Sequence, residues 1–81
     1  MKRVEIETDF IKLDQLLKFA DVVDSGGLSK LLIQEGFVSV NGEICTMRGK
    51  KIIANDEIEI IIPDEDGNPQ EQFELKVVRK K

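Results

Sequence analysis

The chain has 81 residues, of which 41% are hydrophobic and 35% are charged, and its formal net charge is −4. A chain this short has room for one domain, and no apolar run approaches the roughly 20 residues that span a bilayer. We therefore expect a single domain over residues 1–81, no membrane insertion and, because no apolar signal segment follows the first residues, a cytoplasmic location.

The inventory of side chains leaves little scope for catalysis. The chain has no histidine, which is the side chain most often used as a general base at neutral pH. Its single cysteine, Cys45, cannot form an internal disulfide or a Cys/His site. We therefore expect no enzymatic activity, no metal site and no cofactor.

The first part of the chain predicts a strand followed by a helix. Val4, Ile6 and Thr8 alternate with acidic residues, which predicts a strand over residues 3–8 with one buried face. Thr8 or Asp9 is then a candidate cap for a helix, because apolar residues recur after it at intervals of three and four. The buried stripe expected for this helix is Phe10, Leu13, Leu16, Leu17 and Ala20.

A second helix is predicted over residues 27–35. Val22 and Val23 should pack in the connection that precedes it, and Ser25 is a candidate N-cap. Gly36 stands where a left-handed residue would end the helix. The buried stripe expected here is Leu28, Leu31 and Leu32, with Lys30 and Gln34 facing solvent.

Strand patterns dominate the remainder. Residues 37–40 predict a short strand, Asn41-Gly42 a type I′ turn and residues 43–45 the returning strand. A polar, basic loop over residues 46–51 follows, after which Ile52 and Ile53 should re-enter the core. Asn55-Asp56 predicts a turn before a strand over residues 57–62, whose length favours neighbours on both sides.

The last segment, residues 63–81, predicts a hairpin extension. A loop over residues 63–69 leads to a strand containing Phe73, Leu75 and Val77, and residues 79–81 resemble a frayed tail. The four phenylalanines are too dispersed to form a base-stacking platform, and we expect at least three of them in the core. The whole pattern predicts an α+β fold with two short helices packed on a small, mostly antiparallel sheet of four to five strands.

Charge is distributed unevenly along the chain. Eight acidic residues and no basic residue lie between Asn55 and Glu74, whereas Arg48, Lys50 and Lys51 fall in a stretch without acidic residues. For a polyanion, the local field at the contact surface matters more than the net charge. The basic loop could therefore hold an RNA backbone, with Lys12 and Lys30 extending the patch, or it could be an exposed loop kept soluble by its charges.

The run Ser25-Gly26-Gly27 also allows two interpretations. At the start of a helix, free amides and the positive end of the helix dipole form a receptor for phosphate. Alternatively, the corner is a capped turn in which the glycines only relieve backbone strain.

Several separate blocks of sequence together resemble a known family. These blocks are residues 13–18, Ser25-Gly26-Gly27 with Ser29, Lys30, Leu32 and Ile33, then Gly36, Val38, Val40-Asn41-Gly42-Glu43 and Asn55-Asp56-Glu57-Ile58-Glu59. In this order they resemble the S-four-type RNA-binding domain, the alpha-L motif, over a core of residues 12–62. Within this family, the chain resembles small stand-alone bacterial members of the YaaA and YbcJ type.

The resemblance implies a function and a set of contact residues. It implies that the helices pack against a small sheet and that structured RNA, either ribosomal RNA or tRNA, is bound without catalysis. Gly26 stands where many members have arginine, and Asn55 stands where the family usually has glycine. The positions to which the resemblance assigns RNA contact are Lys12, Ser25, Gly26, Gly27, Lys30, Arg48, Lys50 and Lys51.

We expect such a protein to act as a ribosome-associated monomer, with ribosomal proteins as further partners. A competing hypothesis is a protein-interaction module, in which the acidic stretch from Asp56 to Glu74 docks on a basic partner such as a ribosomal protein.

Overall fold

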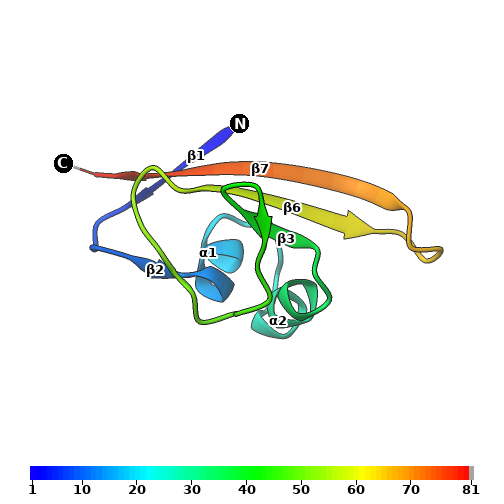
Figure 1. Ribbon diagram of the computed structural model, residues 1–81. Helices are drawn as coiled ribbons and strands as arrows, with labels where there is room; N and C mark the ends of the chain where they lie inside the picture. Colours follow the sequence, from blue (N-terminus) through cyan, green and yellow to red (C-terminus); the bar gives the residue numbers. More distant parts are fainter. Residues whose placement is uncertain (81) are drawn as a thin grey trace.

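Two helices cover one face of a five-stranded sheet, and a small two-stranded sheet lies beside them (Figure 1). The computed structural model describes residues 1–80. The elements are β1 (Lys2–Ile6), β2 (Ile11–Lys12), α1 (Leu13–Phe19), α2 (Gly26–Gln34), β3 (Val38–Val40), β4 (Glu43–Ile44), β5 (Lys51–Ile52), β6 (Glu57–Pro63) and β7 (Pro69–Arg79). This architecture confirms the α+β fold expected from the sequence.

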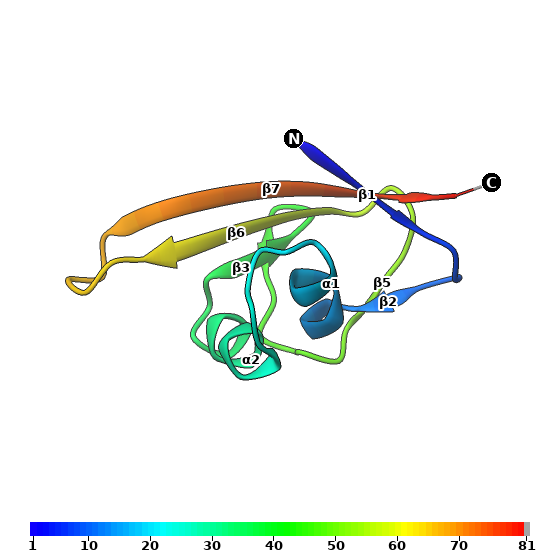
Figure 2. The ribbon, with the colours of Figure 1, turned by 180° about the vertical axis from the view of Figure 1, so that it is seen from behind.

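The strand order of the larger sheet is β1-β7-β6-β3-β4. Every neighbouring pair is antiparallel except β1 and β7, which run parallel. β6 therefore has a neighbour on each side, as its length predicted. Both helices lie on the same side of this sheet, and the β6–β7 hairpin projects beyond the helical layer (Figure 2).

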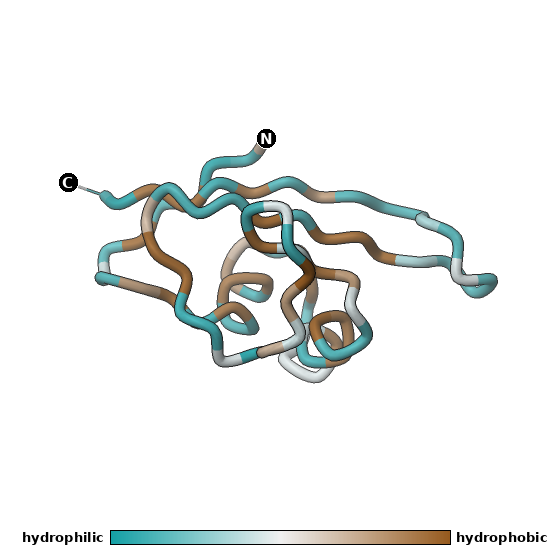
Figure 3. The backbone as a smooth tube through the Cα atoms, viewed as in Figure 1, coloured by the Kyte–Doolittle hydropathy of each residue, from teal (hydrophilic) through white to brown (hydrophobic). Residues whose placement is uncertain are grey.

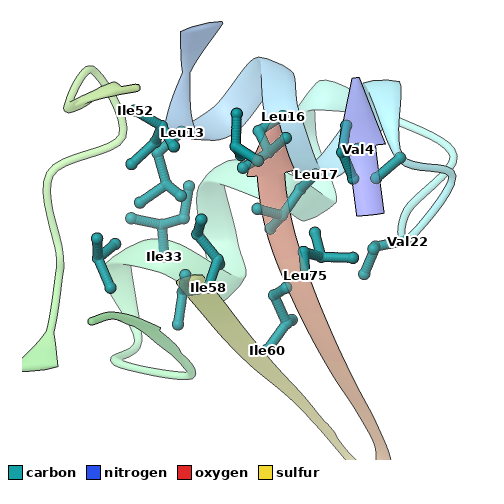
Figure 4. Close-up of a cluster of buried hydrophobic side chains, with 14 of the residues drawn as sticks. Val4, Leu13, Leu16, Leu17, Val22, Ile33, Ile52, Ile58, Ile60 and Leu75 are labelled. Atoms are coloured by element: carbon teal, nitrogen blue, oxygen red, sulfur yellow. The ribbon is translucent and has the colours of Figure 1, made fainter. Parts of the chain in front are cut away.

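The core lies between the sheet and the helices. Ile58 and Ile60 of β6 and Leu75 of β7 point toward the helices and are fully buried (Figure 4). The predicted stripe of α1 meets them, since Leu13, Leu16 and Leu17 have no exposed surface. Val22 and Val23 in the connection are also buried, as predicted.

The start of α1 differs from the prediction. The helix begins at Leu13, and neither Thr8 nor Asp9 caps it, because Ile11 and Lys12 form a strand with β5 instead. The first strand ends at Ile6, and Thr8 is exposed, its hydroxyl donating to the Phe10 carbonyl at 2.7 Å. The helical spacing of the apolar residues could not reveal this pairing, which joins segments far apart in the sequence.

The limits of α2 were predicted closely, but its buried face was not. Ser25 caps the helix by accepting a hydrogen bond from the Leu28 amide at 3.2 Å, and Gly36 follows it with a φ of +83°. The prediction that Leu28 and Leu31 are buried is wrong, because they are 41% and 53% exposed. The helix is rotated so that its buried residues are Ser29, Leu32 and Ile33.

The predicted turns form as expected, but several hydrophobic side chains are more exposed than predicted. The positive φ values of Asn41, Gly42 and Asn55 confirm the two predicted turns. Ile53 is 53% exposed, although its neighbour Ile52 is buried. The expected burial of the phenylalanines is wrong, because Phe10 and Phe19 are exposed and the other two are only partly buried.

The end of the described chain is tied to the sheet. The predicted tail is not frayed at Arg79, which ends β7 and pairs with Asp9, or at Lys80, whose amide donates to the Ile6 carbonyl at 2.9 Å. Lys81, the last residue of the predicted tail, lies outside the described residues. Among residues 1–80, no helix is long and apolar enough to cross a membrane.

Candidate functional site

The basic loop, residues 46–51, lies across the beginning of α1. The Leu13 amide donates to the Lys50 carbonyl at 2.9 Å, and the Asp14 amide donates to the Arg48 carbonyl at 3.1 Å. Amides in the first turn of a helix have no acceptor within the helix, so these loop carbonyls take the place of a side-chain cap. The backbone on either side of Gly49 is thereby fixed at the start of α1.

The short β2–β5 pair brings two lysines, Lys12 and Lys51, to the start of α1. Lys12 is directly opposite Lys51, so their side chains leave the pair on the same face. The Lys51 ammonium lies 4.8 Å from the centre of the Phe10 ring, a cation–π contact that offsets part of the repulsion between the two lysines. We call Lys12, Arg48, Lys50 and Lys51 the α1 basic cluster.

One residue links this cluster to the second helix. The backbone of Asp14 holds the basic loop through its amide and α2 through its carbonyl, which accepts a hydrogen bond from the buried Ser29 hydroxyl at 2.8 Å. Lys30 follows Ser29 directly and is exposed. Asp14 also brings a carboxylate to this region. The carboxylate accepts a hydrogen bond from the Gln15 amide at 2.8 Å.

The backbone of the Ser25-Gly26-Gly27 corner argues against the interpretation that its glycines only relieve strain. Neither Gly26 nor Gly27 has a positive φ, so backbone strain does not require glycine at either position. A Cβ atom on Gly26 would meet nothing within 4 Å, and one on Gly27 would meet only the Ser25 hydroxyl at 4.0 Å. We find no acceptor for the amides of Gly26 and Gly27 among residues 1–80. The corner is therefore an open surface with two amides available to a ligand.

Three acidic residues in the middle of the sheet lie on its other face. Because Ile58 and Ile60 point toward the helices, the alternation along β6 directs Glu57 and Glu59 away from them. The strand register places Glu74 of β7 directly opposite Glu59. These three glutamates line a shallow hollow of about 620 Å³ on this outer face.

The remaining acidic residues of this region lie on the projecting β6–β7 hairpin. Asp64, Glu65, Asp66 and Glu71 are all exposed, and the tip of the hairpin is hydrophilic (Figure 3). Seven of the eight acidic residues between Asn55 and Glu74 are thus separated from the α1 basic cluster by the sheet or by the length of the hairpin. The eighth, Asp56, lies after β5, where its carboxylate accepts the Ile53 amide at 2.9 Å.

Two residues at the site were missed by the sequence reasoning. Phe10 positions the Lys51 side chain, and Asp14 joins the basic loop to α2. The signal available for Phe10 was an aromatic residue two positions before Lys12. No local signal identified Asp14, because its role depends on backbone bonds to distant segments. In the part of the chain that the structure describes, no group of three His, Cys, Asp or Glu residues could hold a metal ion.

The link through Ser29 leads to a prediction about stability. Replacing Ser29 with alanine should lower the free energy of unfolding by about 0.5–1.5 kcal/mol, because the hydrogen bond that joins α2 to the Asp14 carbonyl of α1 is lost. In a domain of this size each 1 kcal/mol corresponds to a fall in Tm of about 4–8 °C. Thermal unfolding followed by circular dichroism measures the effect.

Ser39→Ala is the matched control, since Ser39 lies on the outer face of the sheet and its side chain makes no hydrogen bond within residues 1–80. Equal melting temperatures for the two variants would show that the Ser29–Asp14 bond does not hold the helices together.

Comparison with known proteins gives two matches. A protein-family model described as "S4 domain" matches residues 4–66 of the chain. Over 57 residues, the chain is 44% identical to a protein of Bacillus subtilis (strain 168) described as "Probable ribosome maturation protein RlbA". That alignment covers 70% of this chain and 80% of the relative.

Proposed function

The chain belongs to the S4 domain family, and from this premise we propose that it binds structured RNA without catalysing a reaction. The contact residues we propose are those expected from the sequence. They are Lys12, Ser25, Gly26, Gly27, Lys30, Arg48, Lys50 and Lys51.

The observation that carries this proposal is the separation of charge across the sheet. The α1 basic cluster lies at the start of α1, whereas Glu57, Glu59 and Glu74 lie on the face of the sheet turned away from the helices. An anionic backbone approaching the start of α1 therefore meets the basic cluster, although the net charge of the chain is −4. This arrangement removes the objection that an acidic protein would repel RNA.

The proposed mechanism combines electrostatics with recognition of shape. The lysine and arginine side chains bind phosphates and release counterions, and the open amides of Gly26 and Gly27 receive a further phosphate oxygen. Because the deep groove of A-form RNA hides the base edges from side chains, the surface selects the form of a helix or a bend. Sequence specificity is accordingly weak.

The similarity to a protein described as a ribosome maturation protein supports ribosomal RNA as the ligand, in an immature or mature ribosomal particle in the cytoplasm. Transfer RNA is the alternative RNA target. The acidic outer face also favours a second candidate function, contact with a basic ribosomal protein.

Crosslinking in cells followed by sequencing of the attached RNA tests the proposal. We expect crosslinks concentrated in ribosomal RNA, at helices or bends without a shared sequence. Sedimentation with ribosomal particles before and after ribonuclease treatment separates the two candidate functions, because a contact with a protein survives digestion of the RNA. Association that is unchanged after complete digestion, with no crosslinked RNA, would reject RNA binding.

A further inference from the structure

The outermost strand of the sheet, β1, has one open edge. β1 pairs with β7 on one side, and within residues 1–80 no strand lies on its other side. It is five residues long, which is enough to pair with another strand, and β4 at the opposite end of the sheet has only two residues. An open edge of this kind presents unpaired amides and carbonyls to a neighbouring chain.

The hydrogen bonds show which residues present these groups. The Lys80 amide donates to the Ile6 carbonyl, so the backbone of Ile6 faces β7. In a parallel pair, successive residues alternately direct their amide and carbonyl toward and away from the neighbouring strand. The backbone groups of Arg3 and Glu5 therefore point to the open edge.

The side chains of these two residues carry opposite charge. Val4 and Ile6 are buried against the helices, so Arg3 and Glu5 project from the outer face, and neither is part of an ion pair within residues 1–80. If a second copy of β1 lies antiparallel with Val4 opposite Val4, then Arg3 of each copy faces Glu5 of the other. The same register places the outward amides and carbonyls of Arg3 and Glu5 opposite each other, as an antiparallel ladder requires.

We propose that β1 is a self-association edge, through which two copies of this chain form a two-fold dimer with one continuous ten-stranded sheet. The alternating charges select this arrangement, because a parallel copy in register would place arginine beside arginine and glutamate beside glutamate. This proposal differs from the monomer expected from the sequence, and its interface is the same strand in both copies.

Exposed apolar surface adjoins this edge. A hollow of about 510 Å³ next to β1 is lined in part by Ile6, Ile11 and Phe19, and Phe19 is 61% exposed. Since Phe19 is the last residue of α1, on the helical side of the sheet, a second copy paired at β1 approaches this surface and adds apolar contact to the strand ladder.

In the proposed dimer, the two helical layers face the same way. Antiparallel pairing of identical edge strands places the two-fold axis perpendicular to the sheet, so both helical layers lie on the same side. The two acidic outer faces then share the opposite side. The proposed dimer thus presents two copies of the α1 basic cluster in one direction.

Charge reversal tests the edge directly. Sedimentation or light scattering of the full chain, without RNA, from about 10 μM to 1 mM should show a dimer that forms with increasing concentration. Arg3→Glu and Glu5→Arg should each raise the dimer dissociation constant by about tenfold or more, because two attractive cross-strand pairs become repulsive. Mixing these two variants should restore a heterodimer, since each arginine again faces a glutamate.

Glu5→Pro provides a test of the backbone. The Glu5 amide points away from β7, so proline at this position removes a donor that only the dimer uses, and an edge strand tolerates it. We expect a monomer with an unchanged Tm. Glu59→Arg, a charge reversal on the same face but in the interior strand β6, is the control and should leave dimerisation unchanged.

Two results would overturn the inference. The first is a monomer at every concentration up to about 1 mM, the weak end of specific association. The second is a dimer that Glu5→Pro leaves intact or that the mixed variants fail to restore, which would place the interface elsewhere on the molecule.

Discussion

Alanine at Arg48, Lys50 and Lys51 together is expected to weaken RNA binding and to flatten its dependence on salt. Each phosphate contact contributes about −0.7 to the slope of log K against log salt for single-stranded nucleic acid and about −0.9 for duplex. With about four contacts the intact chain should have a slope of roughly −3, so a rise from 50 to 200 mM salt weakens binding by about 60-fold. One remaining contact leaves about a threefold change.

The expectation follows from how the structure fixes the basic loop. The carbonyls of Arg48 and Lys50 cap α1, so these two residues hold their places through backbone bonds that alanine preserves. The fold should therefore survive the triple replacement, apart from loss of the contact between Lys51 and Phe10. Filter binding or fluorescence anisotropy with a folded ribosomal RNA fragment, over a series of salt concentrations, provides the measurement.

A matched triple variant gives the control. Lys76, Arg79 and Lys80 all lie in or directly after β7, and the last two are paired with Asp9 and Glu7. Replacing them with alanine removes the same formal charge and should change the salt slope little. If both triple variants lose affinity equally, the binding reflects overall charge, and the α1 basic cluster is not the contact surface.

Leucine at Gly27 is expected to affect stability and binding in opposite directions. Gly27 has an ordinary φ and open space where a Cβ would lie, and it is in the first turn of α2. Leucine favours the helix over glycine by up to about 1 kcal/mol, so thermal stability should be unchanged or slightly higher. A phosphate held by the amides of this corner would lose its place beside a bulky side chain.

The loss of binding should be about tenfold or more, since charge-assisted hydrogen bonds contribute about 1.5–3 kcal/mol each and tenfold is 1.4 kcal/mol. Gly27→Ala is the control of intermediate size. Alanine favours the helix as leucine does, but its side chain is a single methyl group. We expect graded affinity from glycine through alanine to leucine, with melting temperatures that do not fall. Unchanged affinity in the leucine variant would show that the corner does not receive phosphate.

The sequence by itself determined the elements whose signals are local. The alternation of Ile58 and Ile60 identified a half-buried strand, and the Asn41-Gly42 pair identified a hairpin turn, because positive φ is confined to few residue types. Ser25 identified the start of a helix, since its hydroxyl accepts a bond from an amide only three residues away. The separate blocks that resemble the family were likewise readable in order along the chain, and the family match agrees with them.

Only the tertiary structure decided how the candidate site is assembled. The start of α1 depends on the pairing of β2 with β5, and the place of the basic loop depends on carbonyls that reach Leu13 and Asp14 from a distant segment. The apolar residues of α2 allow more than one buried face, and these faces differ only by a rotation of the helix about its axis. The Ser29 hydrogen bond to α1 accompanies the face that the structure buries. Short-range periodicity carries no information about such long-range hydrogen bonds. The separation of the acidic sheet face from the basic cluster therefore follows from the packing of the sheet against the helices.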